Sequence, residues 1–209
     1  MLCLSRIVGP QGKVVGADYS EKLIDEAKKR VAKAGVPVEL YVGDAHRLTM
    51  LADNTFDAAR AIAVFHHLEN PAIALQEMIR ITKPSGVILV GELDWETLLI
   101  DHPNRALTRK IVNYMCDRKV RNGWMGRQLP GLFKRFGLLN VQVAPGNLLL
   151  NYPFLNLLAG LEKTVEEMAA KEIAPEDATQ WLSDLRSFDR EDRLSASLGG
   201  FTTTGKKLT

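Results

Sequence analysis

The sequence predicts an α/β fold built on a mostly parallel sheet, and the pattern of its first half carries that prediction. Short runs rich in β-branched residues alternate with amphipathic helical segments. Strands separated by single helices need crossover connections, which give parallel strands covered by helices on both faces. The predicted strands of this half are Lys13–Ala17, Val38–Val42, Phe56–Ala61 and Val87–Gly91.

The two helices between these strands have clear starts and stops. Ser20 is a favourable cap for a helix that runs to Ala34, and Gly35 ends it. The second predicted helix covers residues 70 to 82, with Pro71 in its first turn. The segment Lys83-Pro84-Ser85-Gly86 is expected to break it before the next strand.

The second half is less regular, and we expect a helical cover inserted before a closing strand. Helices are predicted over residues 104–120 and 127–136, a strand over 141–144, helical pattern over 153–192 and a strand over 194–204. The whole chain is predicted to be one domain, with a core at 5–144, the cover at 145–192 and the closing strand at 193–209. Four side chains of the cover suit either core packing or a ligand pocket: Tyr152, Phe154, Met168 and Trp181.

Composition is typical of a soluble globular protein, with 46% hydrophobic and 25% charged residues and a net charge of +2. Basic residues are spread along the chain, so nucleic-acid binding has no electrostatic support. No apolar run approaches the ~20 residues that cross a bilayer, and Met1–Val8 is too short for a signal peptide. A cytoplasmic location is expected. Cys3 and Cys116 have no metal-ligand spacing and are predicted to be buried free thiols.

Polar residues follow all four predicted strands of the first half. In parallel sheets ligands bind at the carboxyl ends of the strands. Helix caps and turns are the alternative explanation for each residue alone, whereas four such ends along one edge favour a ligand site. The residues are Asp18, then Gly43-Asp44-Ala45, then Phe65-His66-His67, then Glu92 and Asp94-Trp95.

Four segments, VVGADYS, GDAHRL, FDAARAIAVFHHLENP and ITKPSGVILVGE, follow one another in a recognisable order and spacing. Together they resemble the motifs of class I S-adenosylmethionine-dependent methyltransferases. The most similar branch contains ubiquinone/menaquinone-biosynthesis C-methyltransferases and small-molecule O-methyltransferases. The resemblance covers Ile7 to about Val143, and SLGGFTTTGKK is similar to the family's last β-hairpin. It implies a Rossmann-like sheet with an antiparallel last strand.

The resemblance also implies roles for particular residues. S-Adenosylmethionine would be the cofactor, with Asp18 and the adjoining Tyr19 at its ribose, and Asp44 and Ala45 at its adenine. Arg60 and Ala61 correspond to the strand end that passes the methionine part. His66, His67 and Asp94 correspond to the acceptor side of the site, where a histidine of near-neutral pKa suits a general base. His67 matches the more regular family position.

The sequence departs from the family at its start. Class I enzymes begin with a strand and a loop like D-x-G-x-G-x-G, whereas Met1–Leu4 corresponds to the helix after that loop. The absent strand would lie between those ending at Asp18 and at Phe65. Three outcomes are open: the neighbours close up, a partner chain (for instance in a homodimer through exposed strand edges) fills the slot, or the sequence is a shortened form. We expect the last, because everything after Leu4 still suits methyl transfer.

Three functions therefore remain open. The first is methyl transfer to a small-molecule acceptor on oxygen or carbon, impaired if the glycine-rich segment is absent. The second is a non-catalytic remnant of the fold that acts as a binding or interaction protein. A nicotinamide-dependent reductase is disfavoured, because Asp18 would suit its ribose but GDAHRL and HHLENP have no role there.

Overall fold

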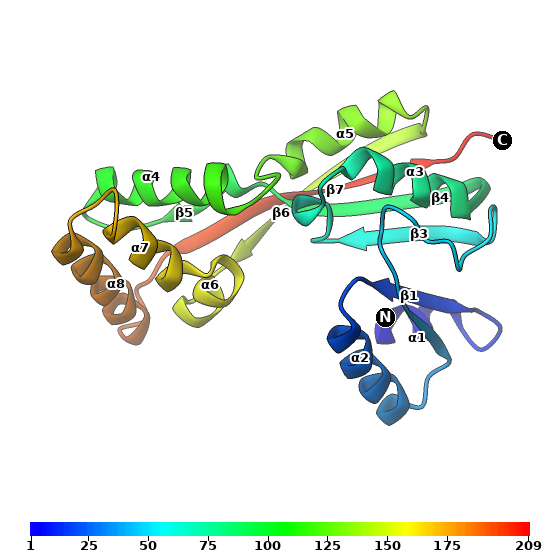
Figure 1. Cartoon of the computed structure of the whole chain (residues 1–209), viewed down its shortest axis with the longest axis horizontal. Coiled ribbons are helices and arrows are strands. Elements are labelled where there is room, and N and C mark those ends of the chain that lie inside the picture. Colours follow the sequence, from blue (N-terminus) through cyan, green and yellow to red (C-terminus); the bar gives the residue numbers. More distant parts are fainter.

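The computed structural model describes residues 1–209 and contains two separate sheets (Figure 1). In the first, β1 (Val14–Asp18) pairs in parallel with β2 (Val38–Val42), from Val14 opposite Val38 to Asp18 opposite Val42. The second has the order β3-β4-β7-β5, with β6 also paired to β7. The parallel strands and the antiparallel last strand confirm the predicted fold class. The bounds are β3 (Phe56–Ile62), β4 (Thr82–Leu93), β5 (Leu99–Ile100), β6 (Leu139–Leu149) and β7 (Ala196–Lys206).

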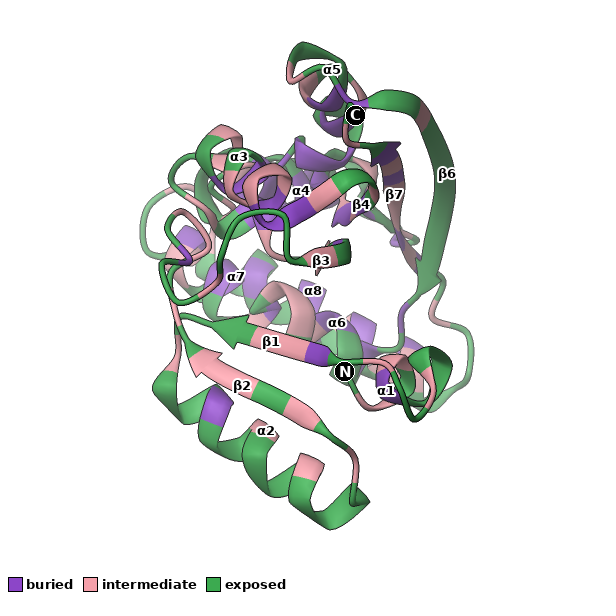
Figure 2. Cartoon of the chain, turned by 90° about the vertical axis from the view of Figure 1, so that its right-hand side faces the viewer, coloured by how far each residue is buried: buried purple, intermediate pink, exposed green.

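The two sheets do not join, because β1 pairs only with β2 and β3 pairs only with β4. The possibility that these neighbours close up is therefore not realised, and each strand keeps one unpaired edge. Figure 2 shows β1 and β2 apart from β3, with largely exposed or half-buried residues. Within residues 1–42 only Ser5, Val14 and Ile24 are buried. The first unit thus contributes little to any core.

Local sequence signals explain the helices of the first half. Ser20 caps α2 (Glu21–Ala34) by accepting the N–H of Leu23, and Gly35 ends this helix with a φ of 61° that favours glycine. The side-chain oxygen of Asn70 accepts the N–H of Ile73 and caps α3 (Pro71–Ile81). The remaining short elements are α1 (Leu2–Val8), η1 (Phe65–His67) and η2 (Trp95–Thr97).

Two hydrophobic cores lie at different places along the molecule. One joins α3 and α5 (Met125–Arg135) to β3 and β4, and includes Leu75, Ile88 and Phe133. The other lies among the helices drawn at the left of Figure 1, and Trp181 is one of its buried residues. These helices are α4 (Arg105–Tyr114), η3 (Met115–Lys119), α6 (Tyr152–Ala159), α7 (Leu161–Ala169) and α8 (Pro175–Arg190).

Three of the four side chains of the cover that suited either core packing or a ligand pocket lie in the second core. Tyr152, Met168 and Trp181 are buried in it, and Trp181 donates its indole N–H to Thr108 at 2.9 Å. These three side chains therefore pack the core. Phe154 is 40% exposed.

Several predicted boundaries shift. The segment 83–86, predicted to be a break, lies inside β4, where Ser85 has a φ of 61°. Strand β6 is longer than predicted, and β5 was not predicted at all.

The cysteine prediction is right for Cys116, where burial raises the thiol pKa to about 11, and wrong for Cys3, which is exposed. No helix combines the length and hydrophobicity needed to cross a membrane.

Candidate functional site

Two carboxylates lie close together at the carboxyl ends of β1 and β2. Asp18 is the last residue of β1, and its backbone oxygen accepts the N–H of Gly43 at 3.0 Å, so Asp44 follows immediately on the neighbouring strand. One side-chain oxygen of Asp18, Oδ1, accepts the N–H of Ser20 at 2.8 Å. This contact is the turn role that Asp commonly has. Tyr19, which lies between Asp18 and Ser20 in the sequence, is 82% exposed.

Asp44 is held by His46. Its Oδ1 accepts the backbone N–H of His46 at 2.9 Å and lies 2.6 Å from Nδ1 of the same residue. The backbone hydrogen bond is the main reason that the pKa of Asp44 is lowered, and the side-chain hydrogen bond adds to it. The second oxygen, Oδ2, of both Asp18 and Asp44 has no hydrogen-bond partner in the protein. Each carboxylate can therefore still accept a hydrogen bond from a ligand. The adjoining Ala45 is half-buried.

His46 also connects the loop after β2 to the start of α3, which packs on the second sheet. Its Nε2 accepts the backbone N–H of Asn70 at 3.2 Å, which leaves the ring proton on Nδ1 facing Asp44. Further along the same loop, the side chain of Glu77 on α3 accepts the N–H of Leu48 at 2.8 Å. His46 lies within GDAHRL but was not among the predicted site residues, because its partner Asn70 is 24 residues away.

The predicted histidine pair lies in η1, after β3. The side chain of His66 is only 4% exposed, and its Nδ1 lies 2.5 Å from Oε2 of Glu92, whose side chain is fully buried. The rings of His66 and His67 are 3.9 Å apart between centroids. His67 is exposed on one side, and its pKa is lowered mainly by partial loss of hydration and next by the charge that His66 can carry.

Asp94, the third predicted acceptor-side residue, is buried in an ion pair with Arg127 of α5. Nη2 of Arg127 lies 2.6 Å from Oδ1, and Nε donates to Oδ2. Nη1 of the same guanidinium lies 2.6 Å from Glu96, and the group stacks over the Trp124 ring at 5.1 Å. Both oxygens of Asp94 are thus occupied by one arginine that the sequence analysis did not single out.

Arg60 and Ala61 lie in β3, opposite Leu89 and Val90 of β4. Arg60 is exposed and makes no ion pair. The predicted residues therefore form two groups, one on each sheet. Asp18, Tyr19, Asp44 and Ala45 lie at the ends of β1 and β2, whereas Arg60, Ala61, His66, His67 and Asp94 lie on β3, on η1 and directly after β4. The His46–Asn70 contact links the groups, and no strand pairing does.

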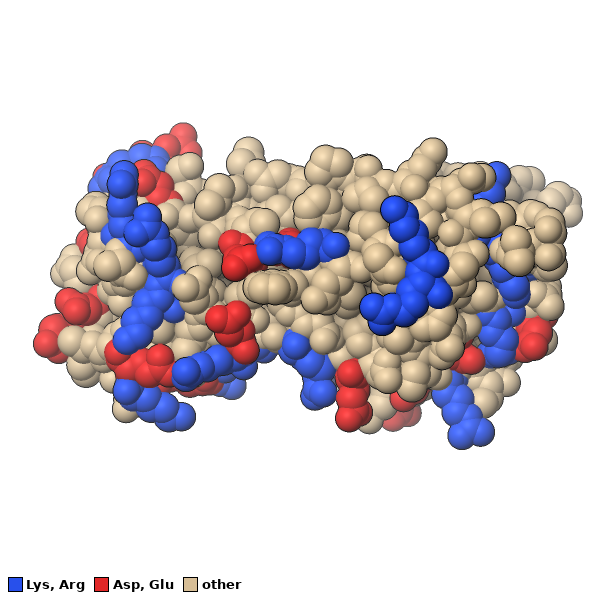
Figure 3. All heavy atoms as spheres, turned by 90° about the horizontal axis from the view of Figure 1, so that it is seen from above, with Lys and Arg blue, Asp and Glu red and all other residues tan.

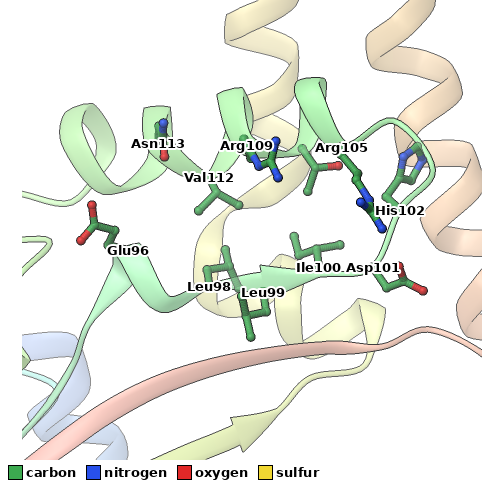
Figure 4. Close-up of a pocket in the computed structure, with 11 residues that line it drawn as sticks. Glu96, Leu98, Leu99, Ile100, Asp101, His102, Arg105, Arg109, Val112 and Asn113 are labelled. Carbon is green, nitrogen blue, oxygen red and sulfur yellow. The ribbon is translucent and has the colours of Figure 1, made fainter.

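A separate cavity of about 320 Å³ lies between β5 and α4 (Figure 4). Its lining combines apolar side chains such as Leu98 and Leu99 with Arg105, Arg109 and Asp101. None of the predicted site residues lines it. On the face drawn in Figure 3, Lys and Arg form separate groups divided by neutral surface rather than a continuous basic track.

Comparisons with known proteins indicate the family and the fold. Residues 2–90 match the family model described as a methyltransferase domain. An uncharacterized 37.1 kDa protein in transposon TN4556 of Streptomyces fradiae is 34% identical over 184 residues, 87% of this chain and 53% of that protein. A demethylmenaquinone methyltransferase of Staphylococcus aureus is 30% identical over 156 residues, 68% of this chain and 64% of that enzyme.

Among solved structures, the phosphoethanolamine N-methyltransferase 2 of Haemonchus contortus, in complex with S-adenosyl-L-methionine, superposes with a TM-score of 0.53. It is 18% identical, and the match covers 94% of this chain and 43% of that one. This likeness shows the fold. The chain spans between half and two thirds of the length of the curated relatives named here. Residues 2–90 of the chain thus match the methyltransferase-domain family, and its fold is that of the class I S-adenosylmethionine-dependent methyltransferases.

Proposed function

We propose that this chain transfers a methyl group from S-adenosylmethionine to a small-molecule acceptor, on oxygen or carbon. The observation that carries the proposal is the pair of carboxylates at the ends of β1 and β2, Asp18 and Asp44. Each keeps one oxygen without a protein partner. In the proposal Asp18, with Tyr19, accepts hydrogen bonds from the ribose hydroxyls, and Asp44, with Ala45, meets the adenine.

The donor set fits the nucleoside half of this cofactor, since hydroxyls and an amine are the donors that two free carboxylate oxygens would accept. Arg60 and Ala61 are proposed to pass the methionine part. A glycine-rich loop of the family type does not occur between a strand and a helix within residues 1–209. Cofactor affinity of this chain by itself is therefore expected to depend on the nucleoside contacts.

On the acceptor side we propose His66, His67 and Asp94. The bound cofactor supplies a methyl carbon on a positively charged sulfur. The acceptor oxygen or carbon forms a bond to that carbon, the carbon–sulfur bond breaks with its electron pair left on sulfur, and the acceptor's proton passes to a histidine nitrogen. Because Arg127 occupies both oxygens of Asp94, the proposed role of Asp94 is to position the strand end rather than to take the proton.

A non-catalytic binding or interaction protein is the second candidate, and the unpaired edges of β1 and β3 favour it. Those edges could also support a homodimer. We keep the cytoplasm as the proposed compartment, with no nucleic-acid partner. Calorimetry with S-adenosylhomocysteine separates the two candidates. Micromolar binding supports the enzyme, whereas no binding at millimolar concentration supports the interaction protein.

A further inference from the structure

Glu92 makes three hydrogen bonds that the methyltransferase motifs did not lead us to expect. Its Oε1 accepts the backbone N–H groups of Val64 and Phe65 at 2.7 and 2.6 Å, and its Oε2 lies 2.5 Å from Nδ1 of His66. The carboxylate is fully buried, at the end of β4. Three donors face its two oxygens, and a carboxylate can accept a hydrogen bond from each of them.

This arrangement determines the tautomer of His66. A carboxylate only accepts hydrogen bonds, so the proton of the neutral imidazole must lie on Nδ1. The basic lone pair is then on Nε2, for which the structure has no protein partner. Asn122 fixes the same segment from the other side, since its backbone N–H donates to the oxygen of His66 and its side-chain amide donates to Phe65 and Leu68. These contacts hold the backbone around His66, while burial and the hydrogen bond to Glu92 hold its ring.

We propose that Glu92 is a positioning residue for proton transfer and that His66, rather than His67, provides the base through its Nε2. When Nε2 takes a proton, the resulting imidazolium faces a buried carboxylate, which stabilises it. His67 has no carboxylate partner, and its ring centroid lies 3.9 Å from that of His66 with the two rings tilted by 50°, so it is less suited to hold a second positive charge. The charged and titratable groups around His66 are Glu92 of β4 and His67 of η1, with the Asp94–Arg127 pair following Glu92 along the chain.

The inference rests on the proposed function and narrows its substrate class. A base at Nε2 is needed only where the acceptor must lose a proton as the new bond forms. The site would then take acceptors with an acidic hydroxyl, such as a phenol or an enol, whose proton passes to Nε2 of His66 and from there to water. An amine that is already neutral does not need this group.

Nuclear magnetic resonance tests the tautomer directly on the 15N-labelled 209-residue chain. Long-range proton–nitrogen spectra of its four histidines are expected to show His66 protonated at Nδ1 and unprotonated at Nε2 at pH 8. In Glu92→Gln, the amide oxygen can still accept from Val64 and Phe65 while the amide NH₂ faces His66. The tautomer should then reverse to Nε2-protonated. An Nε2-protonated His66 in the unaltered chain would overturn the proposal.

The reactivity of Nε2 is measured with diethyl pyrocarbonate, which modifies unprotonated imidazole nitrogens, followed by mass spectrometry. Because the His66 side chain is only 4% exposed, it should react slowly in the unaltered chain, and at least about ten-fold more slowly still in Glu92→Gln, where the wrong tautomer removes its lone pair from Nε2. Glu77→Gln is the matched control, since this carboxylate also accepts a backbone N–H but lies on α3. An unreactive His66 beside a reactive His67 would contradict the inference. Neither measurement needs the cofactor, so the inference and the proposed function can fail separately.

Discussion

Arg127 holds both carboxylate oxygens of Asp94, and this ion pair fastens α5 to the end of β4. Asp94 is fully buried, whereas the arginine is partly exposed. The pKa of Arg127 is raised, chiefly by its hydrogen bonds to Asp94. A buried carboxylate that loses such a partner is left without a counter-charge and away from water, which raises the free energy of the folded state.

Arg127→Met is therefore expected to lower the free energy of unfolding by about 1–3 kcal/mol, measured by urea denaturation. The double variant Arg127→Met/Asp94→Leu should recover part of this loss, because it removes the stranded charge as well. An Arg127→Met chain as stable as the unaltered one would show that the pair does not hold the strand end.

Asp18→Ala is expected to weaken S-adenosylhomocysteine binding by roughly 1–3 kcal/mol, since the ribose hydroxyls lose a charged acceptor. Calorimetry gives the dissociation constant, in whichever form of the protein binds the cofactor. Asp25→Ala is a matched control, because Asp25 is also exposed but lies on α2 in a weak contact with Lys28. If the affinity does not change in Asp18→Ala, the assignment of Asp18 is wrong.

Asp44→Asn is expected to weaken binding less than Asp44→Ala, because an amide oxygen can still accept from the adenine amine. That oxygen then takes the place of Oδ2 and the amide NH₂ takes the place of Oδ1 beside His46, so part of the His46 contact is lost and the melting temperature should fall. Affinities and melting temperatures of both variants would be compared. Equal losses of affinity in the two variants would indicate that Asp44 only organises the loop.

Stability should fall as the pH drops from 7.5 to 5.5. The pKa values of His67 and His102 are lowered in the folded state, in both cases mainly by burial. The unfolded chain therefore binds more protons in this range, and the stability present above the ordinary histidine pKa is lost as the pH falls. Urea midpoints at the two pH values measure the effect, and His102→Gln should reduce it. A midpoint that is independent of pH would contradict these shifts.

Much of the fold could be predicted because its local signals are strong. Strand β2 has the predicted limits. Ser20 and Asn70 begin helices and Gly35 ends one, as these residue types suggest. The misses have physical causes. Strands disfavour proline and glycine, yet β6 continues through Pro145 and Gly146 by pairing with β7, and β5 is a two-residue strand formed only by its partner.

The candidate site was predicted only as a set of strand-end residues. The interactions that organise it join residues far apart in sequence. Glu92 is 26 residues from His66, and Arg127 is 33 residues from Asp94. No local pattern reveals which carboxylate a buried histidine will face, because that choice depends on how β3 and β4 align.

The two groups of predicted site residues are expected to form one site when a strand pairs with both free edges, that of β1 and that of β3. Unpaired edges also favour association of the chain with itself, which light scattering would detect. Placing the strand and glycine-rich loop of a class I relative ahead of Met1 is expected to fill the space between β1 and β3. The same extended chain with its loop glycines changed to alanine serves as the control, since it restores pairing without the close backbone approach.

The deciding measurement is the melting temperature and the S-adenosylhomocysteine affinity of the 209-residue chain and of both extended chains. The account predicts that the extended chain melts higher and binds in the micromolar range, whereas the alanine control melts higher but binds weakly. A 209-residue chain that is already a stable monomer and binds the ligand as tightly as the extended chain would contradict it.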